Sequence, residues 1–243
     1  MLPLAERLRP KTLKEYIGQR HLVGEGAILR QMIERGSLSS FILWGPPGVG
    51  KTTLARIIAH ELERPFYTLS AVTSGVKEVR EVIDKAKRFS AMNSGLFGSP
   101  ESGVQTHLLS DRRAILFIDE IHRFSKSQQD SLLGAVEDGT ITLIGATTEN
   151  PSFEVITPLL SRCQVYVLKS LEKADLLELL HRAVREDEHI RSLGIEIKET
   201  ESILCYTDSE KTLFLLDEPN RLEEAGDVLE KEFRESMEHR LLQ

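Results

Sequence analysis

The chain contains 243 residues, of which 40% are hydrophobic and 28% charged, and its formal net charge at pH 7 is −7. This length allows one large domain, or one domain with a smaller one beside it, and the composition is ordinary for a soluble globular protein. The acidic balance excludes a wholly basic protein that coats nucleic acid, although a local basic patch is compatible with it.

Neither secretion nor membrane insertion is expected. The N-terminal sequence MLPLAERLRPKTLKEY carries charges at Glu6, Arg7 and Arg9 and lacks the apolar core of a signal peptide. No apolar run approaches the about 20 residues that a membrane helix needs. Cys163 and Cys205 form no C-x-x-C pair, so reduced thiols are expected. We therefore expect a cytoplasmic protein with no membrane partner.

Short apolar segments alternate with amphipathic helical patterns through most of the chain. The apolar segments predict strands at Phe41–Trp44, Phe66–Ala71, Ala114–Ile118, Ile141–Ala146 and Gln164–Leu168. The patterns between them predict helices at Thr52–Glu63, Val76–Phe89 and Lys126–Glu137. Strands that alternate with helices indicate an α/β fold in which a parallel sheet is flanked by helices.

Three regions depart from this alternation. Residues 90–113 are rich in serine and glycine, which predicts a mobile loop. Beyond Lys169 the pattern becomes helical, and residues 207–243 predict a further helix with a start signal at Asn220 and Glu223. The α/β core is therefore expected to end near the last strand and to be followed by helices.

The segment GPPGVGKTT lies between the first predicted strand and a helix. Gly45, Gly50, Lys51 and Thr52 fit the pattern G-x-x-x-x-G-K-[ST]. In such a loop the backbone N–H groups and the helix N-terminus cradle phosphates, Lys51 reaches the β- and γ-phosphates, and the Thr52 hydroxyl binds Mg²⁺. The alternative is a structural glycine-rich turn, but the strand before it and the helix after it favour nucleotide binding. The expected nucleotide-binding residues of the loop are Gly45, Pro46, Pro47, Gly48, Val49, Gly50, Lys51, Thr52 and Thr53.

The segment AILFIDEIH supplies the second half of such a site. An apolar strand ends there in Asp119 and Glu120. Both carboxylates should therefore lie where the strands finish, which is the edge at which open α/β sheets bind ligands. We expect Asp119 to hold Mg²⁺ and Glu120 to act as the general base for the attacking water. The alternative, an acidic turn in solvent, is weak beside a phosphate-binding loop.

Two further segments, one after a predicted strand and one before a predicted strand, carry candidate catalytic residues. Thr148 or Asn150, in LIGATTENP, could orient the attacking water, although a structural turn of Thr, Asn and Pro fits the spacing as well. Arg162, in PLLSRCQVYVL, could stabilise γ-phosphate charge in the site of a neighbouring subunit. A surface arginine is the alternative, and the spacing does not decide between the two.

Three of these segments together resemble one family. The segments GPPGVGKTTLARIIA, ILFIDEIHRFSKSQQDSLLGAVEDGTITLIGATTENPSFEV and LLSRCQVYVL are similar to the AAA+ ATPases of the clamp-loader clade. Within the clade the chain resembles the replication-associated recombination protein A type, which LAERLRPKTLKEYIGQRHLVG and SAVTSGVKEVREVI also match. The resemblance covers residues 4–197. It implies a P-loop AAA+ core at 1–169 and a partial helical lid, of which residues 170–206 form the start.

The resemblance also implies roles for individual residues. Lys51 and Thr52 would be the Walker A pair and Asp119 and Glu120 the Walker B pair. Thr148 would be the sensor 1 residue rather than Asn150. Arg162 would be the arginine finger that acts on a neighbouring subunit. The segment around Tyr16, Ile17 and Gly18 would line the adenine pocket.

At the level of function, the family implies a DNA-stimulated ATPase with ATP and Mg²⁺ as its cofactors. It implies action at stalled replication forks, gaps and DNA ends. It further implies a homo-tetramer and a partnership with single-strand binding protein.

The last part of the chain departs from the family pattern. The stretch CYTDSEKTLFLLDEPNRLEE stands where relatives carry the sensor 2 arginine, and the oligomerisation region of the family is not recognised. The tail at 207–243 is atypical and faintly resembles the bacterial transcription-repair coupling factor. We therefore expect a truncated or composite chain with impaired oligomerisation. One alternative function is a nucleotide-gated DNA- or protein-binding module with little turnover, and another is a clamp-loader-like or branch-migration motor subunit.

Contacts to DNA are expected from four basic residues. In relatives the corresponding positions face a central channel, and such contacts would be electrostatic and salt-sensitive. The alternative is a solvated helix face, which the net charge of −7 also allows. The four residues are Lys77, Arg80, Arg123 and Lys126.

Overall fold

The computed structural model describes residues 3–96 and 113–192, and the structural statements that follow concern these ranges. One compact unit runs from Met1 to His189, and a second unit starts at Ile190. The predictions for residues 97–112, for the tail at 207–243, for the stretch without a sensor 2 arginine and for Cys205 lie outside the described residues. The functional division between residues 169 and 170 stays a prediction.

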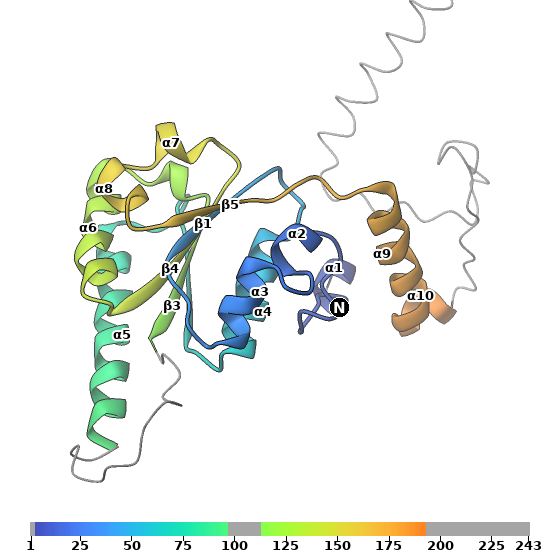
Figure 1. Cartoon of the computed structure of the whole chain (residues 1–243), viewed down its shortest axis with the longest axis horizontal. Helices are drawn as coiled ribbons and strands as arrows, with labels where there is room; N and C mark the ends of the chain where they lie inside the picture. Colours follow the sequence, from blue (N-terminus) through green and yellow to red (C-terminus); the bar gives the residue numbers. More distant parts are fainter. Residues whose placement is uncertain (1–2, 97–112, 193–243) are drawn as a thin grey trace, which may run out of the picture. The chain divides into compact units, whose positions relative to one another are not determined.

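A parallel sheet forms the centre of the first unit (Figure 1). In the described chain its five strands follow the order β2–β3–β4–β1–β5. Their bounds are β1 (Phe41–Trp44), β2 (Phe66–Ser70), β3 (Ala114–Asp119), β4 (Ile141–Thr147) and β5 (Gln164–Val167). The predicted α/β fold is confirmed. Because β4 lies between β1 and β3, the loops that follow these three strands meet at one end of the sheet.

Helices cover both faces of this sheet. The described helices are α1 (Leu4–Arg7), α2 (Arg20–Val23), α3 (Ile28–Glu34), α4 (Lys51–Glu61), α5 (Val76–Leu96), η1 (Ile121–Arg123), α6 (Lys126–Glu137), α7 (Pro151–Glu154), α8 (Thr157–Leu160), α9 (Lys173–Glu186) and α10 (Glu188–Ser192). Figure 1 shows α3 and α4 on one side of the sheet and α5 and α6 on the other.

Two hydrophobic cores explain why the strands are apolar along their whole length. Alternate residues of a strand point to opposite faces, so β1 contributes to both cores. Phe41 and Leu43 pack with Leu54 of α4 in one core, whereas Ile42 packs with Val79 of α5 in the other. A strand that is covered on both faces has no solvent side on which polar residues would be favoured.

Helix α5 is longer than the sequence predicts. Residues 90–113 are predicted as a loop, yet the helix continues to Leu96. That part of the prediction is wrong because serine and glycine only weakly disfavour a helix, while each residue added to an existing helix gains a backbone hydrogen bond.

The first strand ends at Trp44, which is the one tryptophan of the chain. The Trp44 carbonyl accepts a hydrogen bond from the backbone N–H of Leu168 (2.7 Å). On the other side, the backbone N–H of Gly45 donates to the Thr147 carbonyl (3.2 Å). The chain is therefore fixed by both neighbouring strands up to the residue at which the glycine-rich loop begins.

The N-terminal segment, residues 3–19, lies along α4. Arg9 Nη1 donates to Thr53 Oγ1 over 3.3 Å, and Arg56 Nη1 lies 3.5 Å from Glu6 Oε1. The Tyr16 hydroxyl is 3.3 Å from the carbonyl oxygen of Gly50. The segment therefore contacts both the helix and the loop that precedes it.

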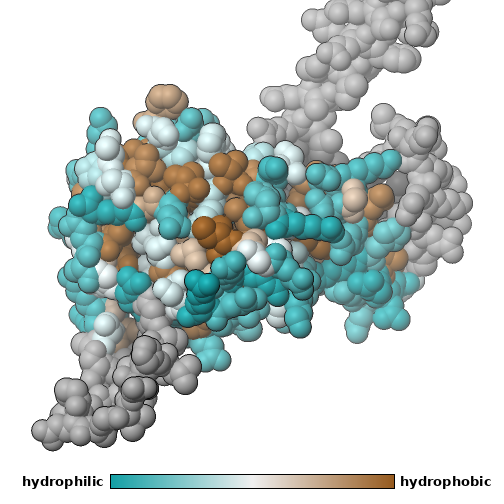
Figure 2. Space-filling view, viewed as in Figure 1, coloured by the Kyte–Doolittle hydropathy of each residue, from teal (hydrophilic) through white to brown (hydrophobic). Residues whose placement is uncertain are grey.

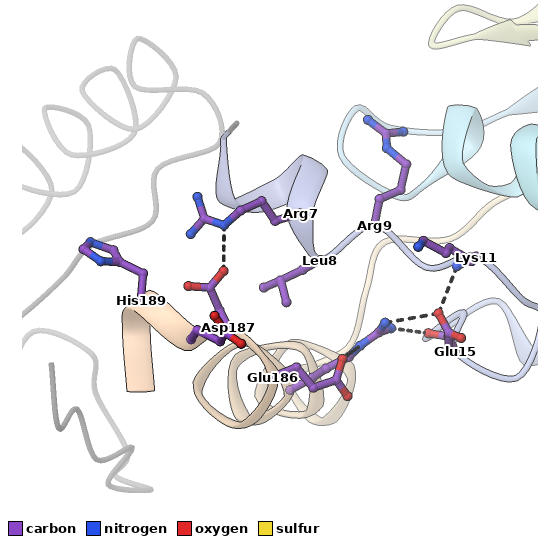
Figure 3. A pocket seen from close by; sticks show the side chains of 10 residues that line it. Arg7, Leu8, Arg9, Lys11, Glu15, Glu186, Asp187 and His189 are labelled. Atoms are coloured by element: carbon purple, nitrogen blue, oxygen red, sulfur yellow. Dashed lines mark hydrogen bonds and ion pairs between the residues drawn. The ribbon is translucent and has the colours of Figure 1, made fainter. Parts of the chain in front are cut away.

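The same segment also contacts α9, as Figure 3 shows. Arg7 Nε donates to Asp187 Oδ2 (2.7 Å), and Arg182 donates to the carbonyl oxygen and to Oε2 of Glu15 (2.9 and 3.3 Å). A cavity of about 620 Å³ lies between the segment and the helix. Its lining mixes basic with acidic side chains that pair with one another, so it does not resemble a site for an anion.

Figure 2 shows separate apolar patches among polar side chains on one face of the molecule. The exposed apolar residues include Val165 and Val167 of the edge strand β5, and Phe153 of α7, which is 84% exposed.

Cys163 is partly exposed and is not in a disulfide, and burial raises the pKa of its thiol to about 12. In the part of the chain that the structure describes, no helix combines the length and the apolar character required to cross a membrane.

Candidate functional site

The glycine-rich loop joins β1 to α4, and neighbouring atoms leave no room for a side chain at Gly45 and Gly50. Gly50 has a φ of 93°, and a Cβ atom there would lie 2.8 Å from the Tyr16 hydroxyl oxygen. A Cβ atom on Gly45 would lie 2.5 Å from the Leu168 carbonyl oxygen. Side chains at these positions would clash with their neighbours. The loop therefore has the compact glycine backbone that a phosphate cradle requires.

Lys51 is the first residue of α4 and its side chain turns back over the loop. Its Nζ atom donates to the carbonyl oxygens of Gly45 (2.7 Å) and Pro46 (2.8 Å). The residue is only 7% exposed. Burial lowers the pKa of the ammonium group, and the charges of Glu120 and Asp119 act in the opposite direction. Lys51 and the two carboxylates therefore form one electrostatic group.

Asp119 ends β3 beside this lysine. Burial raises the pKa of its carboxyl group, and the neighbouring charge of Glu120 raises it further. A hydrogen bond with the Glu120 backbone and the charge of Lys51 partly offset that rise. A carboxylate in such a position gains from a further cation. With the Thr52 hydroxyl it offers the hard oxygen ligands that Mg²⁺ prefers, so the residues fit this metal.

Glu120 follows in a left-handed conformation, with φ 52° and ψ 50°. This turn starts η1 and brings the Glu120 side chain next to His122, with Oε2 3.1 Å from the ring Nδ1. The same Nδ1 lies 3.0 Å from Thr147 Oγ1, at the end of β4. Thr148 Oγ1 lies 3.5 Å from Glu120 Oε2, a long hydrogen bond. Glu120 is therefore surrounded by polar groups from two adjacent strand ends.

The structure separates Thr148 from Asn150. The Asn150 side chain accepts a hydrogen bond from the backbone N–H of Ser152 (3.0 Å) and caps the short helix α7. Asn150 thus has the turn-forming role that the sequence left open. Thr148 instead faces Glu120, which makes it the better candidate for orienting water.

Arg162 lies at the other end of the sheet. It precedes β5, whose first residue Gln164 pairs with Phe41 at the start of β1, whereas the glycine-rich loop follows the end of β1. The guanidinium is exposed, with Nη2 2.6 Å from Glu137 Oε1 and Nη1 2.7 Å from the Pro158 carbonyl oxygen. Arg162 is therefore directed outward and not toward the loop of its own chain.

Tyr16 and Ile17 lie near the loop in different settings. Tyr16 is buried, burial raises the pKa of its phenol, and its hydroxyl lies 3.3 Å from the carbonyl oxygens of both Val49 and Gly50. Ile17 is partly exposed. The adenine-binding role expected for this segment stays a prediction.

The four expected DNA-binding residues are all exposed. They lie at the N-terminal ends of α5 and α6 and in η1, which are the parts of the chain that follow β2 and β3. Gln128 Nε2 of α6 donates to the Ser74 carbonyl oxygen just before α5 (2.8 Å), so these two helix ends are neighbours. The cations thus share the end of the sheet that carries the loop and the carboxylates.

His122 and Thr147 were not among the predicted site residues. The only signal in the sequence is their adjacency to predicted residues, because His122 is in DEIH and Thr147 is the first threonine of TTEN. Their contact with each other depends on the left-handed turn at Glu120 and on the pairing of β3 with β4. Neither feature can be read from the spacing of motifs.

Comparisons with known proteins agree with this geometry. Residues 41–171 match the profile of the ATPase family associated with various cellular activities (AAA). Over 194 residues, or 80% of this chain and 39% of the relative, the sequence is 51% identical to replication-associated recombination protein A of Haemophilus influenzae. It is 48% identical over 182 residues to ATPase WRNIP1 of Dictyostelium discoideum, which covers 75% of this chain and 19% of that protein.

A solved structure shows the same fold. The Thermotoga maritima RuvB Holliday junction branch migration motor aligns with a TM-score of 0.51 and 34% sequence identity, over 73% of this chain and 54% of that one. The resemblance to replication-associated recombination protein A, expected from the motifs, is confirmed by these matches. This chain spans 39% of the length of the Haemophilus influenzae relative.

Proposed function

This chain belongs to the AAA family of ATPases, and from that premise we propose that it binds ATP with Mg²⁺, hydrolyses it and uses the turnover in DNA maintenance. One observation carries the proposal. Lys51, Asp119 and Glu120 are close enough that the charge of each carboxylate acts on the pKa of the lysine. A buried cation beside a glycine-rich loop and two carboxylates is the arrangement that phosphoryl transfer requires.

Each residue then has a distinct task in hydrolysis. The backbone of residues 45–50 and Lys51 would hold the β- and γ-phosphates. Thr52 and Asp119 would hold Mg²⁺, which supplies neutralisation of the phosphate charge. Glu120 would take the proton of the attacking water, and Thr148 would orient that water.

The outward direction of Arg162 supports a reaction shared between copies of the chain. A guanidinium at the opposite end of the sheet would serve the site of a neighbour, where it stabilises charge on the γ-phosphate. Homo-oligomers would therefore be the active form, and activity per molecule would rise with protein concentration.

The likeness to replication-associated recombination protein A supports the biological setting. We propose DNA forks, gaps or ends as the nucleic-acid partner, single-strand binding protein as a protein partner, and the cytoplasm as the location. The basic residues at the N-terminal ends of α5 and α6 would contact phosphates, and binding through them would weaken as salt concentration rises.

Phosphate release measured with and without DNA tests this function. We expect ATP turnover that requires Mg²⁺ and is stimulated by forked, gapped or blunt-ended DNA. The matched control is the Lys77→Gln, Arg80→Gln double variant, which should keep DNA-free turnover and lose the stimulation. Absence of Mg²⁺-dependent turnover at all protein concentrations, with ATP still bound, would favour the alternative of a nucleotide-gated binding module.

The RuvB likeness favours one further candidate, a branch-migration motor. A four-way junction that dissociates into duplexes in an ATP-dependent manner would support this candidate. Stimulation of turnover by forks and gaps without junction dissociation would support the fork-maintenance role instead.

A further inference from the structure

We propose that His122, held by Thr147, is a positioning residue that fixes the direction of the Glu120 carboxylate; this inference rests on the proposed hydrolysis. Glu120 has the left-handed backbone that non-glycine residues seldom adopt. The turn brings the carboxylate over η1, where His122 is two residues further along the chain. Oε2 of Glu120 and Nδ1 of His122 are 3.1 Å apart, which is hydrogen-bond distance.

Thr147 determines which atom of this pair carries the proton. Its hydroxyl oxygen lies 3.2 Å from the Glu149 carbonyl oxygen, to which it donates, and it accepts from the Glu149 backbone N–H (3.0 Å). Because the hydroxyl proton is committed to Glu149, Thr147 Oγ1 acts as an acceptor toward His122 Nδ1 at 3.0 Å. Nδ1 must then carry a hydrogen, which it donates to Thr147 Oγ1, and Glu120 Oε2 lies 3.1 Å from the same nitrogen.

The support for this contact is rigid. Thr147 is completely buried, and it ends the central strand β4, where it pairs with Trp44 of β1. The side chain of His122 is 14% exposed. An imidazole between a fixed hydroxyl and a carboxylate restricts the rotation of that carboxylate. A general base is effective only when its oxygen is held in reach of the proton that it removes.

Nucleotide binding alone gives the contact between His122 and Glu120 no role. Lys51 and Asp119 would act on phosphates and metal, whereas the polar contacts of His122 within residues 3–96 and 113–192 are with Glu120 and Thr147. Removing the imidazole should therefore slow turnover without weakening ATP binding. It should leave the glycine-rich loop unchanged.

Two substitutions of His122 separate positioning from packing. Asparagine places an N–H donor at the position of Nδ1, whereas leucine has a similar shape and no donor. We expect His122→Leu to lower kcat by about tenfold, the effect of one hydrogen bond, and to leave the Kd for ATP unchanged. His122→Asn should retain most of the wild-type kcat. Thr147→Val should lower kcat by a smaller factor, since the imidazole keeps its position along the chain.

The measurements are steady-state phosphate release, calorimetric titration with ATP, and the thermal midpoint of each variant. Wild-type and Glu120→Gln proteins are assayed together with them, so that failure of the proposed function appears as a wild type without turnover. If the wild type is active and Glu120→Gln is not, equal kcat values for His122→Leu and His122→Asn overturn the positioning role. A higher kcat in His122→Leu also overturns it, because the contact would then restrain the base in an unproductive direction.

Discussion

The two ends of the sheet differ in how their charged groups are buried and paired. At the end where the strands finish, Lys51, Asp119 and Glu120 are wholly or partly buried, and their charges act on one another. At the end where the strands begin, Arg162 is exposed and pairs with Glu137, which is the last residue of α6. One end therefore holds the residues that we propose to bind phosphates, and the other presents the exposed cation that we propose to serve a neighbouring copy.

The difference between the two ends indicates which of the proposed catalytic groups a single chain can supply to one site. The proposed binding groups and general base follow β1 and β3, on either side of β4 in one parallel sheet, so they converge without help from a second copy. The cation at the opposite end cannot reach them within the same chain. Substitutions at the two ends should consequently differ in whether their effect depends on protein concentration.

The largest effect is expected from Arg162→Ala. An arginine supplied by a neighbour contributes about 10³–10⁵ in rate. Wild-type activity per molecule should therefore rise with protein concentration, whereas the variant should stay low throughout. Glu137→Gln is the matched control, because it removes the ion-pair partner and keeps the cation. Phosphate release over a concentration series provides the measurement, and a flat wild-type profile with an equally active variant would exclude a shared site.

Glu120→Gln should reduce turnover by about 10²–10⁴, since glutamine has the same shape and cannot accept the proton. ATP binding should persist, because the phosphates are held by the loop. Single-turnover hydrolysis and calorimetric titration measure the two effects separately. Turnover within a few-fold of the wild type would show that another residue is the base.

Lys51→Ala should weaken ATP binding by roughly 100-fold, because a buried charged donor to the phosphates is lost. Unlike Arg162→Ala, this loss should be the same at every protein concentration. Calorimetric titration with ATP gives the Kd directly. An unchanged affinity would contradict the phosphate-binding role of the loop.

The smallest effect is expected away from both ends, where Arg182 connects α9 with the N-terminal segment. Arg182→Gln should lower the Tm at pH 7 by no more than about 3 °C, because its ion pairs are near the surface. Hydrogen bonds from Arg182 and Arg185 hold the pKa of Glu186 below its usual range. Glu15 also has a lowered pKa, caused first by the Lys11 backbone N–H and partly by Arg182.

The pH dependence of that difference follows from the direction of these shifts. A carboxylate whose pKa is lowered by folding stabilises the protein above its unfolded pKa, and the contribution disappears as pH falls through the folded value. The difference in Tm between wild type and Arg182→Gln should therefore shrink between pH 7 and the acid range. High salt should shrink it as well. A difference that grows on acidification would contradict the ion-pair account.

Much of the sheet and of the glycine-rich loop could be predicted from the sequence because both are local. The strand ending at Trp44 and the helix Lys126–Glu137 match the predicted bounds, since an apolar run and a helical pattern specify them directly. The loop is bounded by the same strand and by α4, so its place in the fold follows from the motif alone.

The remainder depends on contacts between distant segments. The order that puts β4 between β1 and β3 decides that Thr148 lies beside Glu120, and strand order is not encoded in any one segment. The spacing did not decide between Thr148 and Asn150, although the family resemblance favoured Thr148. Similarly, the outward direction of Arg162 depends on its pairing with Glu137 of α6.

The position of Trp44 has an optical consequence. The chain contains no other tryptophan, so its indole emission can be assigned to one residue without labelling or mutation. That residue is partly exposed and directly precedes Gly45. Its carbonyl oxygen accepts a hydrogen bond from the backbone N–H of Leu168. Intrinsic fluorescence of the unmodified chain therefore reports on the surroundings of the residue immediately before the glycine-rich loop, and a change in emission after rapid mixing with nucleotide would follow those surroundings in real time.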